Sequence, residues 1–417
     1  MNTEKTLFLN WQTADEIAKK FSTPCYVYDE AALEEQAKKA LSFPNAFGIT
    51  VRYAMKAASN KEILRLFSSL GLHIDASSAY EVKRAILAGI PPEHISLSSQ
   101  QLPDDLKEIV SAGVKYNACS FRQLEEYGKA APGSNVGIRI NAGLGSGSTN
   151  RTNVGGPASS FGFWFEYADK IKETAQKYGL KIVRIHTHIG SGSDPKVWQK
   201  VAKMNLDNVA KFPDVDTLNM GGGYKVARVS GEHSTDLIKI GAPIAELIRD
   251  FADKTGRKLK FEIEPGTFLL ANSAAVLATV QDMCDTGAQG YKFLKLNSGM
   301  TDILRPSIYG AQHPISILSK VPRAETEEYI VCGHCCESGD ILTPAPGDPE
   351  GLLPRKMQKA EIGDYCVIGG AGAYCSSMST SNYNSYPASP EVMLCKDGSL
   401  KLIRKRQTLE QIVENEI

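Results

Sequence analysis

The stretch TVRYAMKAASNKEILRLFSSLG, residues 50–71, decides the fold because it contains one complete strand-and-helix unit. Its first half, TVRYAMKA, is short, apolar and rich in β-branched and aromatic residues, which predicts a buried strand. Its second half, NKEILRLFSSLG, has the spacing of an amphipathic helix that ends at Gly71. Lys56 stands at the tip of this strand, where a lysine either reaches solvent along its apolar stem or is held inside a site. The stretch by itself favours the surface position.

The same unit recurs along the next two hundred residues. Short apolar strands, each ending in small or polar residues and followed by a helical segment, are predicted at 50–57, 73–77, 95–99, 116–120, 136–141, 182–190, 217–223 and 260–266. Eight consecutive βα units predict a (β/α)8 TIM-like barrel, with an open doubly wound sheet as the alternative. A closed barrel accommodates eight consecutive parallel strands more easily than an open sheet does.

The pattern changes beyond residue 285, where short strands lie between Pro and Gly turns without long helices. This change predicts a mainly β C-terminal domain. The early segment CYVYD (25–29) resembles an additional strand that could pair with that domain. The predicted division is 1–30 for an N-terminal strand segment of the β domain, 31–280 for the barrel and 281–417 for the C-terminal β domain.

Composition excludes several classes of protein. The 417 residues include 47 basic and 47 acidic side chains, so no net field favours nucleic acid or an anionic membrane. No apolar run is long enough to span a bilayer, and MNTEKTLFLN has no signal-peptide pattern. The nine scattered cysteines argue against a secreted disulfide framework. We therefore expect a cytoplasmic protein without nucleic-acid or membrane partners.

Chemically useful side chains collect at the predicted C-terminal tips of the barrel strands, where barrel enzymes place their sites. These residues are Lys56, Asp75, Arg139, His186, His188, Gly221, Gly222, Gly223 and Glu264. Each has an ordinary structural explanation when taken singly: Asp75 could cap a helix, His188 could be a core histidine and the glycines could form only a turn. Together on one rim they favour a site.

These groups suit one cofactor. Three glycines leave backbone N–H groups free to converge on an anion, to which Ser191 offers a hydroxyl. A carboxylate such as Glu264 can keep a heterocyclic nitrogen protonated, and a lysine of tuned pKa can form a Schiff base. A phosphate site, an imine-forming lysine and a carboxylate together predict binding of pyridoxal 5'-phosphate.

At this point the chain resembles a known family, the fold type III (alanine-racemase-like) pyridoxal phosphate decarboxylases, and within it the branch that decarboxylates diaminopimelate. The resemblance covers nearly the whole chain and is specific because its segments occur in order. They are YAMKAASN, IDASSAYE, HTHIGSGS, NMGGGY, EIEPG, NSGMTDILRPSIYGAQH, CCESGD and GAGAYCSSMSTSNYN.

The resemblance implies a role for each matching position. Lys56 would carry the Schiff base, Asp75 would support it, His188 would lie against the cofactor ring and Glu264 would pair with the pyridine nitrogen. The phosphate would be held by Ser191, Gly221, Gly222, Gly223, Gly266 and Tyr374. Substrate would be bound by Arg305, Tyr309, Tyr374 and Glu337, and Cys336 would be the catalytic cysteine. A homodimer with shared active sites is also implied, CCESGD reaching the partner's Lys56.

One departure stands out: many relatives have an arginine after Glu-Pro-Gly, where this chain has Thr267. Arg151 or Arg305 could take over its part. In VCGHCC, residues Cys332, His334, Cys335 and Cys336 could be mistaken for zinc ligands, but no second ligand pair follows, so we expect no metal.

The implied activity is decarboxylation of meso-2,6-diaminopimelate to L-lysine and CO2, the last step of lysine biosynthesis. The rivals are a decarboxylase acting on ornithine, arginine, carboxynorspermidine or a glutamyl thioester, a non-catalytic pyridoxal phosphate-binding protein, and a racemase. Glu337 beside Cys336, with Arg305 present, favours a substrate that has a distal amine and a distal carboxylate. The long segment after the barrel argues against a simple carrier.

Overall fold

The computed structural model describes residues 8–144, 155–188, 190, 192 and 194–417. It divides into two compact units, each of which draws on more than one part of the chain. One unit comprises residues 34–226 and 233–269, and the other comprises residues 1–33, 227–232 and 270–417. None of the helices in the described part is long and apolar enough to cross a bilayer.

The first unit is the predicted barrel. Its strands are β2 (Ile49–Ala54), β3 (His73–Ala76), β4 (Ile95–Leu97), β5 (Lys115–Ala118), β6 (Asn135–Asn141), β8 (Lys181–His186), β9 (Thr217–Asn219) and β10 (Lys260–Ile263). All pair in parallel in the order β5-β4-β3-β2-β10-β9-β8-β6, and pairing of β5 with β6 closes the ring. The closed eight-stranded barrel confirms the predicted fold over the open sheet.

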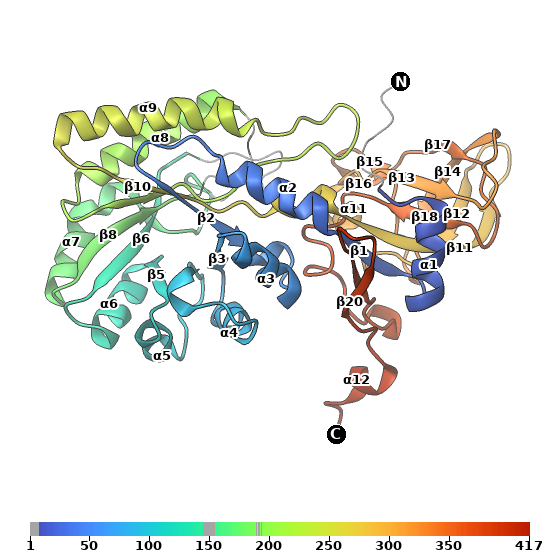
Figure 1. Cartoon of the computed structure of the whole chain (residues 1–417), viewed down its shortest axis with the longest axis horizontal. Helices are drawn as coiled ribbons and strands as arrows, with labels where there is room; N and C mark the ends of the chain where they lie inside the picture. The colour runs from blue at the N-terminus through green and yellow to red at the C-terminus, as the bar shows by residue number, and fades with distance from the viewer. Residues whose placement is uncertain (1–7, 145–154, 189, 191, 193) are drawn as a thin grey trace. The chain divides into compact units, whose positions relative to one another are not determined.

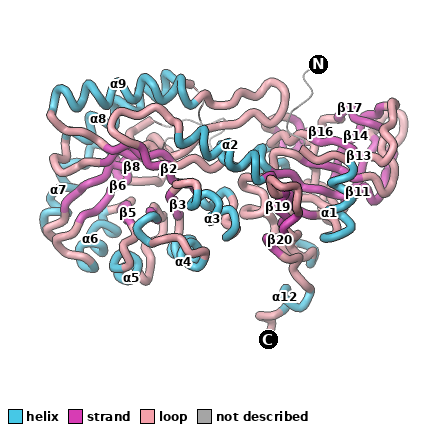
Figure 2. Tube along the Cα trace, in the orientation of Figure 1, coloured by secondary structure: helices cyan, strands magenta, loops and turns pink. Residues whose placement is uncertain are grey.

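The helices of this unit surround the strands (Figure 1), in cyan around magenta in Figure 2. They are α3 (Lys61–Ser69), α4 (Ala79–Leu87), α5 (Leu106–Ser111), α6 (Phe121–Ala130), α7 (Ala168–Lys177), α8 (Pro195–Ala210) and α9 (Leu237–Thr255). Helix α3 shows why the sequence forms a helix here. The Asn60 side chain caps its start by accepting the N–H of Glu62, and its buried face consists of Ile63, Leu64 and Phe67. Gly71, with a φ of +93°, ends it.

The observed strands stop earlier than the sequence predicts. β8 ends at His186, β9 at Asn219 and β10 at Ile263, whereas the apolar and glycine-rich pattern extends three to four residues further. The predicted site residues therefore lie just beyond the strand ends, in turns. A further short strand, β7 (Phe163–Trp164), pairs with β6 and was not predicted.

The second unit is built on a nine-stranded sheet. Its strands are β1 (Cys25–Asp29), β11 (Ala274–Asp285), β12 (Lys292–Leu296), β13 (Ile315–Leu318), β14 (Thr326–Cys332), β17 (Arg355–Gln358), β18 (Tyr365–Ile368), β19 (Glu391–Leu394) and β20 (Leu400–Arg404). β15 (Pro344–Ala345) and β16 (Asp348–Leu352) form a separate pair. The predicted N-terminal strand, β1, lies between β11 and β19, which confirms that the β domain takes a strand from the start of the chain.

Four helices complete the chain: α1 (Trp11–Phe21), α2 (Glu30–Leu41), α11 (Arg305–Tyr309) and α12 (Leu409–Val413), besides the single turn α10 (Thr267–Leu270). Ala14 and Ile17 of α1 are buried in one apolar cluster with Cys25 and Val27 of β1. Burial of this helix face is what fixes the N-terminal segment onto the sheet.

Candidate active site

Lys56 lies in a short 3₁₀ turn, Met55–Ala57, that follows β2 directly. The Tyr53 hydroxyl fastens the turn, because it donates to the carbonyl of Ala58 (2.6 Å) and accepts the N–H of Ala58 (3.0 Å). The N–H of Ala54 also donates to the carbonyl of Pro265, just past β10. Lys56 is exposed, yet its charge acts on Asp75, Glu81 and His188. The lysine is therefore held on the functional rim of the barrel.

Glu264 is the most firmly held carboxylate on this rim. His186 Nε2 lies 2.9 Å from its Oε2, and Asn219 Nδ2 donates to its Oε1 at 2.6 Å. Burial raises the pKa of Glu264, but the charge and hydrogen bond of His186, with help from His188 and Asn219, outweigh burial and lower it to about 2. Glu264 is thus an anion that accepts from His186, and it can stabilise a protonated ring nitrogen.

Asn219 was missed by the sequence reasoning, although it organises the rim. Besides binding Glu264, its Nδ2 donates to Glu262 Oε2 (3.1 Å), and its Oδ1 accepts the N–H of Gly221 (2.8 Å). Below it, Glu262 Oε1 accepts from Arg52 (2.8 Å) and Arg184 (3.1 Å), all three being buried. Two features of the sequence could have revealed this network. One is an asparagine at the end of the buried strand TLN, and the other is a pair of glutamates two positions apart in FEIE, whose side chains face the same side.

The glycine run Gly221–Gly223 forms a tight turn on this rim. The amide of Gly221 donates to Asn219 Oδ1, and a contact of Gly221 with the phosphate stays a prediction. A Cβ at Gly221, whose φ is +69°, would lie 2.5 Å from the carbonyl oxygen of Thr187. A Cβ at Gly222 would lie 2.3 Å from the carbonyl oxygen of Glu264. The glycines therefore let the turn pass closely between the ends of β8 and β10.

Polar atoms on this rim are buried without a hydrogen-bond partner among the described residues. They are Asp75 Oδ1, Arg139 Nη2, His186 Nδ1 and His188 Nδ1. Burial, followed by the charge of Glu264, raises the pKa of Asp75, and burial followed by the charge of Lys56 lowers that of His188. Buried polar atoms normally have partners, so this cluster fits a polar, aromatic ligand such as pyridoxal phosphate. Ser191, expected at the phosphate, and Arg151 lie outside the described residues.

The predicted substrate-binding residues and the predicted catalytic cysteine belong to the β unit. Arg305 and Tyr309 are in α11, Cys336 and Glu337 follow β14, and Tyr374 follows β18. Tyr374 has a φ of +57°, a conformation that is uncommon for an aromatic residue and is often kept at functional sites. Cys336 and Glu337 are both exposed.

Asp340, the last residue of CCESGD, holds the loop that carries Cys336 and Glu337. Its Oδ1 accepts the N–H of Met300 at 2.7 Å, and its Oδ2 accepts the N–H of Cys335 at 2.9 Å. A Cβ at Gly333 would lie 2.2 Å from Asp340 Oδ2, so only glycine fits there. The N–H of Cys336 donates to Asn384 Oδ1 at 2.9 Å. Asp340 belongs to the CCESGD motif of the sequence, but its partner Met300 comes from a distant segment, which the sequence does not reveal.

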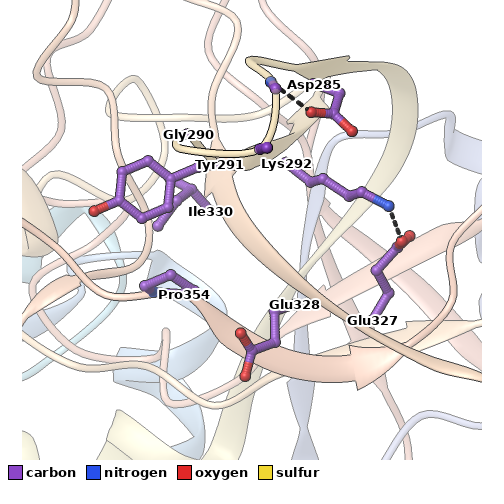
Figure 3. Close-up of a pocket in the computed structure, with 10 residues that line it drawn as sticks. Asp285, Gly290, Tyr291, Lys292, Glu327, Glu328, Ile330 and Pro354 are labelled. Atoms are coloured by element: carbon purple, nitrogen blue, oxygen red, sulfur yellow. Dashed lines mark hydrogen bonds and ion pairs between the residues drawn. The ribbon is translucent and has the colours of Figure 1, made fainter.

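A pocket of about 430 Å³ in the same unit is a separate feature (Figure 3). It lies around the turn between β11 and β12, where Lys292 and Glu327 form an ion pair and Glu328 and Tyr291 also line the wall. No residue that we predicted for the site lines it. This pocket is therefore not part of the candidate active site.

Comparison with known proteins identifies the family. Residues 31–271 match the model of the pyridoxal binding domain of pyridoxal-dependent decarboxylases. Diaminopimelate decarboxylase of Streptomyces coelicolor is 34% identical over 410 residues, which cover 96% of this chain and 90% of the relative. A crystal structure of a diaminopimelate decarboxylase has a TM-score of 0.89 at 33% identity, covering 96% of this chain and 95% of that one.

A second solved structure is that of diaminopimelate decarboxylase from Helicobacter pylori complexed with L-lysine. Its TM-score is 0.83 at 29% identity, and the match covers 96% of this chain and 98% of that one. Similarity of this kind extends through both units of the chain. A parallel barrel whose rim carries a strand-tip lysine, a buried ionised glutamate and a glycine turn, together with these matches, shows that the chain belongs to the pyridoxal-dependent decarboxylase family.

Proposed function

We propose that this protein catalyses the pyridoxal phosphate-dependent decarboxylation of meso-2,6-diaminopimelate to L-lysine and CO2, the last step of lysine biosynthesis. The observation that carries the proposal is the Glu264 carboxylate, buried, ionised and bound by His186 and Asn219 on the same rim as Lys56. The near full-length similarity to diaminopimelate decarboxylases supports the choice of substrate over the other amino acids.

The residues of the barrel would hold the cofactor. Lys56 Nζ would attach it covalently, and Glu264 would keep its ring nitrogen protonated. His188, Asp75, Gly222, Gly223 and Gly266 would complete its contacts. When bound, pyridoxal phosphate supplies the electron sink for the pair of electrons left behind as CO2 departs. The protein contributes orientation and fixed charges around that sink.

The residues of the β unit would bind and protonate the substrate. Arg305 and Tyr309 would hold its remaining carboxylate, with Tyr374 beside substrate or phosphate, and Glu337 would bind the distal amine. Cys336 would donate the proton from its Sγ to Cα after CO2 has left. An arrangement that matches both distal groups discriminates against ornithine or arginine, which lack a distal carboxylate.

We further propose that the active form is a homodimer with shared sites, in which CCESGD reaches the partner's Lys56. Exposure of Cys336 and Glu337 supports this, because both side chains are available to another subunit. All nine cysteines are free, which is consistent with the reducing cytoplasm that we expect for the enzyme.

A substrate panel tests the proposed function. Purified, cofactor-loaded protein is given meso-diaminopimelate, ornithine, arginine and carboxynorspermidine, and both CO2 release and product chirality are scored. We expect CO2 from diaminopimelate alone and a product of the L configuration. Faster release from ornithine or arginine would move the assignment to a rival decarboxylase, and no release at all would favour a non-catalytic binding protein.

A further inference from the structure

Arg228 is a buried arginine for which sequence reasoning found no role. It lies in the short segment 227–232, which belongs to the β unit although barrel residues flank it on both sides in the chain. Two hydrogen bonds hold it there: Asn272 Nδ2 donates to the carbonyl of Ala227 at 2.9 Å, and Arg228 Nε donates to the carbonyl of Gly370 at 3.0 Å. Only 7% of Arg228 is exposed.

The backbone past β18 is shaped to receive this side chain. Gly370 has a φ of +65°, and a Cβ there would lie 2.9 Å from Cδ of Arg228. A larger residue would be strained in that conformation and would also press on the arginine stem. The position of the Arg228 guanidinium is thus fixed by its own hydrogen bond and by a glycine.

Arg305 is positioned by the neighbouring carbonyl of Gly369, through the side chain of His313. Its Nη1 lies 3.3 Å from His313 Nε2, and His313 Nδ1 lies 2.9 Å from the carbonyl oxygen of Gly369. Arginine can only donate, so Nε2 must be the acceptor and Nδ1 must carry the proton that it donates to Gly369. His313 is fully buried and neutral, since burial followed by the charges of Arg305 and Arg228 lowers its pKa. The consecutive carbonyls of Gly369 and Gly370 therefore position two guanidinium groups.

Neither guanidinium is paired with a carboxylate within the described chain, although the charge of Glu232 acts on Arg228 without forming an ion pair with it. No described carboxylate forms an ion pair with Arg228 or Arg305, and Arg228 Nη2 is buried without a partner. The nearby Glu232 carboxylate instead accepts the backbone N–H of Arg228, at 2.7 Å. By contrast, Arg323 in the same unit is paired with Asp364 and Glu361, and Arg404 is paired with Glu391. A buried, unpaired guanidinium is costly unless an anion joins it.

We propose that Arg228 and Arg305 together bind the substrate carboxylate that is not lost as CO2, and that Arg228 is a specificity-determining residue. This inference rests on the proposed function. A planar carboxylate has two oxygens. Each oxygen can accept from a different guanidinium, or both can accept from the same one. Thr267 offers no such donor, and Arg228 supplies a second guanidinium from a different segment.

The matched ligands L-lysine and L-lysinamide test the proposal, because they differ only in a carboxylate replaced by a neutral amide. Their affinities for the cofactor-loaded protein are measured by isothermal titration calorimetry. We expect wild type to prefer lysine. In Arg228→Gln the affinity for lysine should fall about 10- to 100-fold, as for loss of a hydrogen bond to a charged group, while lysinamide binding changes little. Arg228→Lys should recover part of the preference.

Arg323→Gln is the matched control, since it removes an arginine of the same unit whose charge is already neutralised. Its preference for lysine should equal that of wild type. Equal losses for lysine and lysinamide in Arg228→Gln, with a lowered melting temperature, would show that Arg228 is only structural. Unchanged lysine affinity in an active Arg228→Gln protein would overturn this inference alone, whereas a wild type that releases no CO2 from diaminopimelate would overturn it together with the proposed function.

Discussion

His186 Nε2 lies 2.9 Å from Oε2 of Glu264, on a carboxylate whose other oxygen accepts from Asn219. Because an ionised carboxylate can only accept, Nε2 of His186 must carry the proton that it donates to Glu264, and burial lowers the pKa of His186. Both oxygens of Glu264 are thereby oriented before any ligand arrives. This preorganised anion is the basis of the first prediction.

Glu264→Gln should lower kcat by roughly 100- to 1000-fold, the range seen when one preorganised electrostatic group is lost. An amide cannot keep the ring nitrogen protonated, while the remaining contacts should still retain the cofactor. Turnover and the visible absorbance of bound cofactor are measured together. Glu126→Gln, on the exposed face of α6, is the control. Near-normal turnover in Glu264→Gln would show that this carboxylate is only structural.

Borohydride reduction of the loaded protein should fix the cofactor to Lys56, because the Tyr53 hydroxyl holds the turn Met55–Ala57 on the rim. Peptide mapping by mass spectrometry identifies the labelled lysine. Lys56→Ala should lose the visible band, and Lys61→Ala, a short distance along the chain at the start of α3, should keep it. A label on any other lysine would remove Lys56 from this role.

Asp340→Asn should lower kcat by up to roughly 100-fold, the effect of a misplacement of about 1 Å, with cofactor absorbance unchanged. An amide nitrogen at the Oδ2 position cannot accept the N–H of Cys335, so the loop with Cys336 and Glu337 should shift. Asp397→Asn is the control, because that carboxylate only closes a turn with Ser399. If kcat stays within twofold of wild type, Asp340 does not position the loop.

Glu262 should make the protein sensitive to acid. Burial raises its pKa, but Arg184 and Arg52 outweigh burial and lower it from 4.5 to about 2. A folded pKa below the unfolded one stabilises the protein above the unfolded value, and this stabilisation is lost as pH falls toward 2. The amount is on the order of 3 kcal/mol.

Urea unfolding between about pH 2.5 and pH 6 measures the contribution of ionised Glu262 to the free energy of unfolding. The free energy of unfolding of wild type should fall more steeply with acid than that of Glu262→Gln. Glu325→Gln, an exposed residue paired with Lys359, should follow wild type. Parallel curves for wild type and Glu262→Gln would mean that Glu262 titrates alike in the folded and unfolded states.

Subunit exchange tests the shared site. Lys56→Ala and Cys336→Ala should each be nearly inactive, and a mixture should recover about a quarter of wild-type activity. Random exchange makes about half of the dimers mixed, and each mixed dimer has one site with both residues intact. Recovery of no activity would assign both residues to one chain's own site and leave the cofactor assignment standing.

The sequence by itself determined the barrel and the β domain, and it placed Lys56 at the end of a barrel strand. The reason is local: a strand-and-helix unit repeated eight times has few ways to bury its apolar faces, and Lys56, His188 and Glu264 stand at recognisable positions after strands. Hydrophobic periodicity could not locate the strand ends. The pattern at 217–223 stays apolar and small, yet strand β9 ends at Asn219 and the glycine turn follows.

Only the tertiary structure decided which polar residues act together. Asn219 joins Glu262 to Glu264 because parallel pairing places β9 beside β10. Asp340 reaches Met300, forty residues away in the chain, and Arg228 reaches Gly370 across 142 residues. Such partners are set by how distant segments pack, and no local propensity or spacing encodes them. That is why Arg228, in a stretch without any motif, emerged as a carboxylate-binding candidate only when the fold brought it beside Gly370.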